Sequence, residues 1–383
     1  MAILWRNSAL AGRHAEIGGE LEDWNGMGTA WFYDNTPERA KADYEAIRTK
    51  AGLMDVSGLK KVHVVGEDAA YVIDRVTTRN VEKIAPGRAV YACMLDVRGL
   101  FVDDCVIYHL AVNSWLVVHG TGIGMEQLTT VAAAKNCSVI MDDDLHDMSL
   151  QGPKAVDILA KDIPAIRDLA YFGIMQTRLY GRDVMISRTG YTGERGYEIF
   201  CRAKDAVHIW DNVLAAGGDD VRPTQFSTLD MLRIESYLLF YPGDNSETFP
   251  FADGSPAGDS LWELGLDFTV SPDKTGFIGS ENHYAMQGKE RFKIYGLQLS
   301  GDAMDQMEMF AREHHDGKDV GVITYGLSSE LNGYSVAIAR LDPSVASPGT
   351  KLTVVQPDGT ELAATAEEMP FYDKDKSIRT AKG

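Results

Sequence analysis

Alternation of apolar and polar residues predicts most of the strands in this chain. Alternation over about 4 to 8 residues is typical of a half-buried strand, whereas apolar residues three and four apart are typical of a helix. Strands and helices mix here without a strict strand–helix–strand order, which favours an α+β fold over a doubly wound sheet. The predicted strands are residues 61–65, 89–95, 100–109, 115–119, 137–141 and 149–152, and the predicted helices are 36–51, 67–73, 128–134, 153–160, 203–216 and 227–239.

The pattern changes after about residue 290 to short strands separated by turns. Strands are predicted at 294–299, 320–325, 334–341 and 351–355, which together indicate a small β-barrel. We place the domain boundary near Lys289, so that residues 1–288 form two interwoven α+β subdomains and residues 289–383 form the barrel. The segment Pro242 to Gly258 is rich in Pro, Gly, Asp and Ser and predicts a long surface loop.

One helix start is clear near the N-terminus. In Thr36-Pro37-Glu38 the threonine can cap the helix, and proline fits the first turn. Gly52 is expected to end this helix. Residues 1–36, by contrast, show little periodicity and allow no prediction of elements.

Composition narrows the classes of function. The chain has 383 residues, of which 45% are hydrophobic and 24% charged, as in an ordinary globular protein of two or three domains. The net charge of −19 disfavours nucleic acid and anionic membrane surfaces, because both require clustered Lys and Arg, and no apolar run is long enough to span a bilayer. The cysteines have no CxxC spacing and predict reduced thiols of a cytoplasmic protein, with no disulfide framework or metal site; they are Cys93, Cys105, Cys137 and Cys201.

The stretch RTGYTGERGYEIF, residues 188–200, carries the strongest functional signal. Its three glycines, spaced by three, lie between two strand-like runs and predict a tight glycine loop, because glycine accepts positive φ and close backbone approach. The returning strand contains Glu198 between Tyr197 and Ile199. Burying an unpaired carboxylate is costly. Glu198 therefore lies either on the solvent face of an ordinary hairpin or in a site that uses its charge.

Two adjacent acids, Asp103 and Asp104, lie within an apolar strand pattern. Neighbours in a strand point to opposite faces, so one of the two must face the interior if the strand continues through them. The alternative is a turn at the end of the strand with both acids in water.

Several segments resemble, in order, the folate-binding aminomethyltransferase family, whose founder is the T-protein of the glycine cleavage system. The resemblance implies a three-domain cloverleaf around a central folate cavity, with the last domain a β-barrel, and tetrahydrofolate as the one-carbon acceptor. Besides residues 188–200, the matching segments are 51–69 (AGLMDVSGLKKVHVVGEDA), 91–108 (YACMLDVRGLFVDDCVIY), 150–155 (LQGPKA) and 229–244 (LDMLRIESYLLFYPGD).

The resemblance also implies roles for individual residues. Asp104 matches the acid beside the reactive folate nitrogen, where a carboxylate can stabilise positive charge and accept the displaced proton. Glu198 matches the glutamate that holds the pterin, because two carboxylate oxygens can accept from a ring N–H and an exocyclic amine side by side. Tyr91 corresponds to an aromatic residue that frames the ring, and Tyr191 lies where a ring could stack; each of them alone would read as core filler.

The chain departs from the T-protein pattern in ways that bear on the donor. The folate-binding arginine of T-proteins is replaced by Leu229, and the N-terminal segment that forms the entry to their site is missing. These departures resemble the folate-dependent demethylases of the family, such as dimethylsulfoniopropionate demethylase. Trp24, Trp31 and Tyr33 would suit a small methylated cation through cation–π contact, and the alternative is a hydrophobic anchor for the N-terminal segment.

Three hypotheses follow for function. The first is a methyltransferase that moves a methyl group from a small sulfonium, betaine or methylamine donor to N5 of tetrahydrofolate. The second is the aminomethyltransferase of glycine cleavage, which alone would require a lipoyl carrier protein as partner. The third is a non-catalytic folate-binding protein. For the assembly, the sequence leaves a homodimer open.

Overall fold

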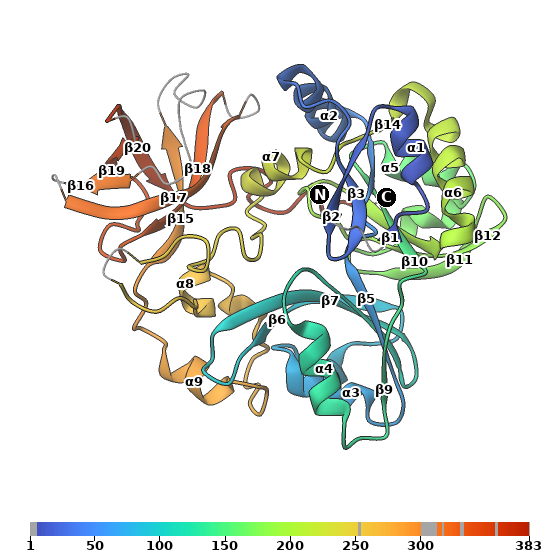
Figure 1. Ribbon diagram of the computed structural model, residues 1–383, viewed down its shortest axis with the longest axis horizontal. Helices are drawn as coiled ribbons and strands as arrows, with labels where there is room; N and C mark the ends of the chain where they lie inside the picture. Colours follow the sequence, from blue (N-terminus) through green and yellow to red (C-terminus); the bar gives the residue numbers. More distant parts are fainter. Residues whose placement is uncertain are drawn as a thin grey trace.

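Three lobes make up the protein in a computed structural model that describes residues 6–251, 254–299, 312–315, 318–329, 333–356 and 359–382. Figure 1 shows the lobes around a common centre: a six-stranded sheet with helices, a five-stranded sheet below it, and the C-terminal barrel. The predicted α+β class with a C-terminal barrel is confirmed.

The first lobe is built on a six-stranded sheet. Its strand order is β11–β12–β13–β10–β4–β14, and all pairs except β4–β14 are antiparallel. The chain leaves this sheet after β4 and returns at β10, so the second lobe is an insertion. The strands are β4 (Gly52–Asp55), β10 (Leu145–Gln151), β11 (Ile174–Leu179), β12 (Arg182–Ser187), β13 (Gly196–Arg202) and β14 (Arg222–Pro223), and the helices are α2 (Pro37–Thr49), α5 (Ala155–Ala160), α6 (Ala203–Gly217) and α7 (Thr228–Glu235).

The N-terminal residues form a small sheet against this lobe. The order is β1–β3–β2, which the weak periodicity of residues 1–36 did not predict. The elements are β1 (Arg6–Asn7), α1 (Ala11–Glu16), β2 (Glu20–Trp24) and β3 (Met27–Phe32).

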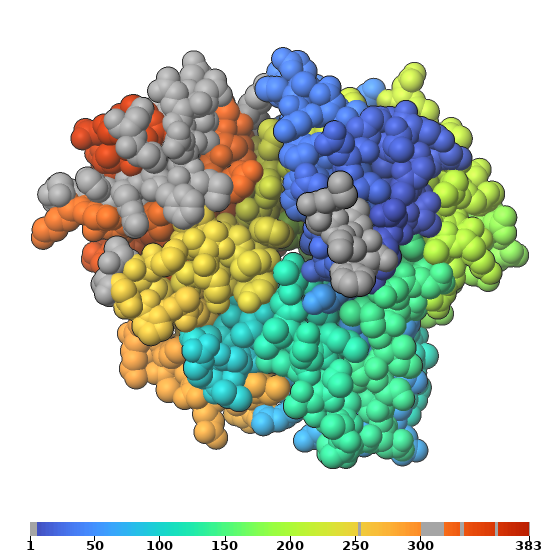
Figure 2. Space-filling model, in the orientation of Figure 1, coloured from blue at the N-terminus to red at the C-terminus, as the bar shows by residue number. Residues whose placement is uncertain are grey.

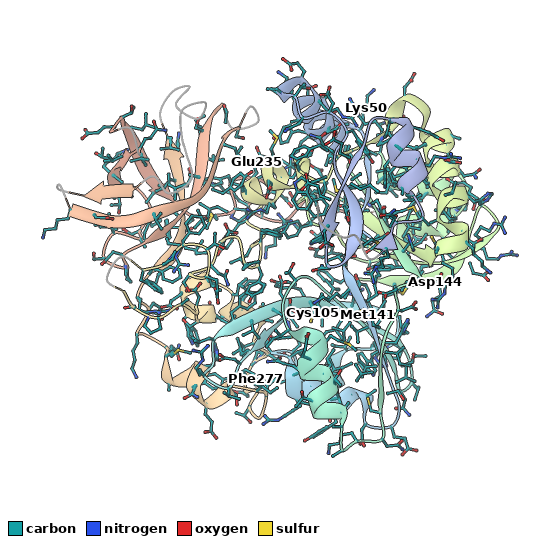
Figure 3. All side chains as sticks on the ribbon, in the orientation of Figure 1. Lys50, Cys105, Met141, Asp144, Glu235 and Phe277 are labelled. Atoms are coloured by element: carbon teal, nitrogen blue, oxygen red, sulfur yellow. The ribbon has the colours of Figure 1, made fainter. Side chains whose placement is uncertain are left out.

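The second lobe is a five-stranded antiparallel sheet in the order β6–β7–β8–β5–β9 with two helices. Its core includes Cys105, whereas Phe277 belongs to a separate core shared with the barrel; Figure 3 labels both. The elements are β5 (Lys60–Val65), α3 (Ala69–Val76), β6 (Arg88–Leu95), β7 (Phe101–Ala111), β8 (Ser114–His119), α4 (Gly124–Ala132) and β9 (Ser138–Met141).

The third lobe is a closed barrel in the order β15–β18–β17–β16–β19–β20. Two short helices, α8 (Leu261–Leu264) and α9 (Ser280–Ala285), precede it, and 3-10 turns lie at Val81–Lys83, Pro164–Asp168, Gly218–Asp220 and Asp267–Thr269. The barrel strands are β15 (Lys293–Leu299), β16 (Arg312–His315), β17 (Lys318–Ser329), β18 (Tyr334–Leu341), β19 (Lys351–Val355) and β20 (Glu361–Glu367).

The predicted start of α2 at Thr36 is confirmed, and its predicted end at Gly52 is wrong. Thr36 caps the helix by accepting a hydrogen bond from the Arg39 backbone N–H. The helix ends at Thr49, however, and Gly52 begins β4. A Cβ on Gly52 would lie 2.5 Å from Ile47 Cγ1, so glycine is required here for the close approach of strand to helix.

The segment Pro242 to Gly258 is a loop in its described residues (242–251 and 254–258), but the prediction that it lies on the surface was wrong for its beginning. Asp244 is buried because it accepts hydrogen bonds from Arg233 (2.7 Å) and from the Thr324 hydroxyl (2.9 Å). These partners come from α7 and from the barrel. The loop therefore joins lobes through buried charge rather than extending into solvent.

Candidate functional site

The predicted glycine loop connects β12 to β13 at the centre of the first lobe. Added side-chain atoms at Gly190 or Gly196 would collide with the amide of Gln151, and Gly193 has φ +80°. The Gln151 amide nitrogen in turn donates to the Thr189 carbonyl at 3.1 Å. Close packing and positive φ therefore both require glycine, and they fix the position of the strand that carries Glu198.

Glu198 is half-buried and belongs to a polar network, not to the solvent face of a hairpin. Tyr108 donates to its Oε2 at 3.1 Å, and the Thr189 hydroxyl donates to the same oxygen. Burial raises the pKa of Glu198, and the two hydrogen bonds oppose that effect. Both hydrogen bonds that Glu198 receives from the described residues end on Oε2. Oε1 receives none from them.

The two adjacent aspartates divide as strand geometry requires. Asp103 is fully buried and accepts from the Gly124 backbone N–H (2.9 Å) while its Oδ2 lies 2.7 Å from His119 Nδ1. Asp104 is half-buried on the opposite face and accepts from the Tyr91 hydroxyl at 2.7 Å. Burial and the neighbouring charge of Asp103 raise the pKa of Asp104 to about 7. A carboxyl group of that pKa can both give and take a proton near neutral pH.

Strand β7 links the two predicted acids. Asp104 and Tyr108 are four residues apart and so share one face, about 13 Å apart at about 3.3 Å per residue. The hydroxyl of Tyr108 reaches Glu198 on the first lobe. Sequence reasoning missed Tyr108, although its even spacing from Asp104 was a usable signal. The two acids thus lie over one face of one strand, at the junction of the first and second lobes.

The two predicted tyrosines lie on the Asp104 side of the site. Burial is the main cause that raises the pKa of Tyr91 and of Tyr191, and the charge of Asp104 raises both further. The Tyr191 hydroxyl donates to the carbonyl of Leu238 at 3.0 Å. This bond ties the glycine loop to the segment after α7.

The three aromatic residues predicted for the donor do not stay together. Trp24 and Trp31 each pack against Phe226 in a tilted arrangement, with ring centroids 4.5 Å apart, in a cluster that also contacts Tyr191. Tyr33 is buried elsewhere, with its hydroxyl 2.9 Å from His14 Nδ1. Leu229 packs into the same cluster as the two tryptophans. The position to which the resemblance assigns an arginine in T-proteins is therefore part of this apolar cluster here.

A buried ion network holds the lobes around the site. Arg48 of α2 donates to Glu194 of the glycine loop (2.9 Å) and to Glu235 of α7 (2.7 Å). Tyr372, beyond the barrel, donates to Glu194 at 2.7 Å, and the Ser329 hydroxyl of the barrel donates to Glu235. Glu235 is labelled in Figure 3, and Figure 2 shows the blue N-terminal, teal and yellow segments meeting near the centre of this face.

Three lobes with a C-terminal barrel are the architecture that the resemblance to the aminomethyltransferases implied. Comparison with known families agrees. Residues 10–274 match the "GCVT N-terminal domain" and residues 293–373 the "Glycine cleavage T-protein C-terminal barrel domain". The chain therefore belongs to the glycine cleavage T-protein family and is an enzyme of that one-carbon-transfer type.

Individual relatives point in two directions. The chain is 55% identical, over 100% of both chains, to "Heme-dependent oxidative N-demethylase gamma subunit" of Ectopseudomonas mendocina. It is 31% identical to "Aminomethyltransferase" of Cutibacterium acnes, over 96% of this chain and 99% of the other. The solved structure of the glycine cleavage aminomethyltransferase T of Bartonella henselae shares the fold, with a TM-score of 0.84 at 22% identity, covering 97% of this chain and 99% of that one. Among the residues that the structure describes, no helix has the length and apolarity needed to cross a membrane.

Proposed function

We propose that this enzyme transfers a one-carbon unit from a small N-methylated amine to tetrahydrofolate. The observation that carries the proposal is the pair of acids over one face of β7, Glu198 hydrogen-bonded to Tyr108 and Asp104 to Tyr91. Glu198 has one carboxyl oxygen, Oε1, that receives no hydrogen bond from a described residue, and Asp104 has a pKa of about 7. A reduced pterin requires both properties, because it is held at one edge and gives up a proton at its reactive nitrogen.

In this proposal each residue has a defined task. Glu198 accepts hydrogen bonds from the pterin edge in a charge-assisted pair. Asp104 stabilises positive charge on the reactive nitrogen, takes the displaced proton and returns it to the leaving amine. Tyr91 orients the Asp104 carboxyl group through its 2.7 Å hydrogen bond. The remaining rate enhancement comes from alignment of the donor carbon with the folate nitrogen, because transfer of carbon between two amines needs no protein nucleophile.

The name of the 55% identical relative supports a particular oxidation level for the carbon. Oxidative removal of an N-methyl group converts the carbon to the level of formaldehyde. The expected product is then methylenetetrahydrofolate, whereas direct displacement from a sulfonium, betaine or methylamine donor would give methyltetrahydrofolate. The word "gamma subunit" in the same name supports assembly with an oxidising partner, which would supply the activated carbon.

Glycine cleavage is the second candidate, favoured by the 31% identity to an aminomethyltransferase over nearly the whole chain. The apolar cluster at Leu229 counts against it, because the resemblance assigns a folate-binding arginine to that position in T-proteins. Its substrate would be an aminomethyl-lipoyl protein, and its products methylenetetrahydrofolate and ammonia.

Product analysis separates these reactions. The purified chain would be incubated with tetrahydrofolate and ¹³C-labelled donors: formaldehyde with dimethylamine, a sulfonium, a betaine, trimethylamine and aminomethyl-lipoyl protein. We expect enzyme-dependent labelled methylenetetrahydrofolate from the formaldehyde–dimethylamine adduct, and loss of the enzyme-dependent rate in Glu198→Gln. Turnover with the lipoyl protein alone would instead establish glycine cleavage. Methyltetrahydrofolate from any donor would establish direct methyl transfer.

A further inference from the structure

Asp147 is a buried acid next to the site that none of the reaction steps above uses. On β10 it is two residues from Ser149, the direct partner of Glu198 on β13. Direct partners in an antiparallel pair share a face, so the carboxyl groups of Asp147 and Glu198 point to the same side of the sheet. Asp147 has no exposed surface, and neither of its carboxyl oxygens accepts a hydrogen bond from any described residue.

Charges from every neighbouring element act on this carboxyl group. Lys61 is the cation, but its Nζ donates to the carbonyls of Ser57 (2.6 Å) and Leu59 (2.7 Å), not to Asp147. Burial first and the charge of Glu198 second raise the pKa of Asp147 well above its usual range, and Lys61 opposes them. The titratable groups around Asp147 are Glu198 and Cys201 on β13, Lys61 on β5, Asp55 on β4 and Tyr108 on β7.

Two carboxylates on one face, of which Asp147 is fully buried and Glu198 half-buried, cannot both be charged without a cost unless hydrogen bonds compensate each of them. Glu198 has such bonds, from Tyr108 and Thr189, and Asp147 has none among the described residues. The negative charge of the pair therefore resides on Glu198, and the proton on Asp147.

We propose that Asp147 is a positioning residue that keeps a proton beside Glu198, so that Glu198 alone carries the charge offered to the pterin edge. The role of Asp147 at the pterin edge rests on the proposed folate function, whereas its protonation rests on the burial and contacts of the two acids. When Asp147 ionises, its charge competes for the Tyr108 hydroxyl, which lies in the field of both acids. Glu198 then loses a hydrogen bond that orients it.

Stability as a function of pH tests the protonation state without any ligand. A group whose pKa is raised by folding loses stabilisation as pH rises from its unfolded value toward its folded value. Asp147→Asn cannot ionise, so its folding equilibrium constant relative to the natural chain should rise by up to about tenfold per pH unit above about pH 4. The matched control is Asp144→Asn, three residues earlier and exposed (60% of its side chain), labelled in Figure 3; its ratio should stay flat.

The measurement is the urea midpoint of both variants and the natural chain from pH 5 to 8. A ratio that is flat or that falls with pH would overturn the proposal, because Asp147 would then be ionised and stabilised, with Lys61 as its partner. The Glu198→Gln background adds a cycle. Removal of the neighbouring charge should lower the pKa of Asp147, so in this background the rise of the ratio should level off at a lower pH, with the range extended to pH 10. Levelling off at the same pH in both backgrounds would refute coupling between the two acids.

Tetrahydrofolate binding supplies the functional arm, measured by calorimetry over the same pH range. In the natural chain the affinity for tetrahydrofolate should fall as the pH rises through the alkaline end of this range, and in Asp147→Asn this alkaline fall should be absent. An alkaline limb retained by Asp147→Asn would contradict the role assigned to it. If the natural chain bound no reduced folate at any pH, the proposed function would fail, while the stability measurements would still decide whether Asp147 holds the proton.

Discussion

Replacing Asp104 with asparagine tests the chemistry with little change in shape. The amide oxygen can still accept the 2.7 Å hydrogen bond from Tyr91, but the side chain can no longer take a proton. A positioned general acid or base contributes about 10²–10⁴ in rate. At about 1.36 kcal/mol per tenfold, the loss of transition-state stabilisation is about 2.7–5.4 kcal/mol. We expect kcat/KM to fall by that factor while the Kd for tetrahydrofolate changes by about threefold or less.

The raised pKa of Asp104 gives the same substitution a second, opposite effect. Its pKa of about 7 lies about 3 pH units above the usual 3.8, because of burial and the charge of Asp103. A raised folded pKa means that stability is lost as pH rises from about 4 to 7, by at most about 4 kcal/mol at about 1.36 kcal/mol per unit. Asp104→Asn avoids this loss. It should therefore unfold at higher urea than the natural chain at pH 8, and the difference should shrink toward pH 4.

The assay combines single-turnover rates with urea unfolding on the same samples, from pH 5 to 9. Because the carboxylate is the active form, the natural rate should rise with pH through about 7, and Asp104→Asn should show no such limb. Asp183→Asn, whose side chain is 92% exposed on β12, is the control and should change neither quantity. A rate within about fivefold of the natural chain, outside the range given above for a general base, would refute the role of Asp104. A fall in kcat/KM that is fully explained by a weaker Kd for tetrahydrofolate would also refute the role of Asp104.

Three further substitutions probe the site and its frame. Glu198→Gln should weaken tetrahydrofolate binding by about 10- to 100-fold, since hydrogen bonds to a charged group contribute about 1.5–3 kcal/mol; calorimetry would measure it, and unchanged affinity would contradict the assignment. Arg48→Met leaves two buried glutamates without their cation and should lower the unfolding free energy by about 3–5 kcal/mol, measured in urea; a loss below about 1 kcal/mol would show that the network is not structural. Gly193→Ala should destabilise by more than about 1 kcal/mol, because φ is +80° and the new Cβ would collide with Ser236 Oγ. Gly181→Ala has φ +78° in open space, so an equal fall in melting temperature for the two would refute the collision.

Local patterns predicted the parts of the fold in which one element determines its own structure. Alternation located strands such as β5 and β7, and the Thr36 cap located the start of α2. The barrel was predicted because its strands are short, alternating and separated by turns. The N-terminal sheet was missed, because the two residues of β1 are too few for a period and form a strand through pairing with β3.

The site divides in the same way. The glycine loop and the acids of β7 and β13 were visible in the sequence, because a carboxylate inside an apolar strand is costly unless it is used. Thr189 and Asp147 were not visible as site residues, and Tyr108 was signalled only by its even spacing from Asp104. Tyr108 and Thr189 donate to Glu198 on another strand, and Asp147 lies beside Glu198 through the pairing of β10 with β13; contacts between strands have no signal in a single stretch of chain.

The amino-acid sequence by itself determined the class of fold and the family, because each of these is written in short segments with their own spacing. It also predicted Asp104 and Glu198 as the acids of the site. Tertiary structure alone decided that Asp104 accepts from Tyr91, that Tyr33 lies apart from Trp24 and Trp31, and that Asp147, which accepts no hydrogen bond from a described residue, lies beside Glu198. These outcomes depend on which strands pair and which lobes meet. Distance and burial, which set the pKa of a carboxyl group, exist only after the chain has folded.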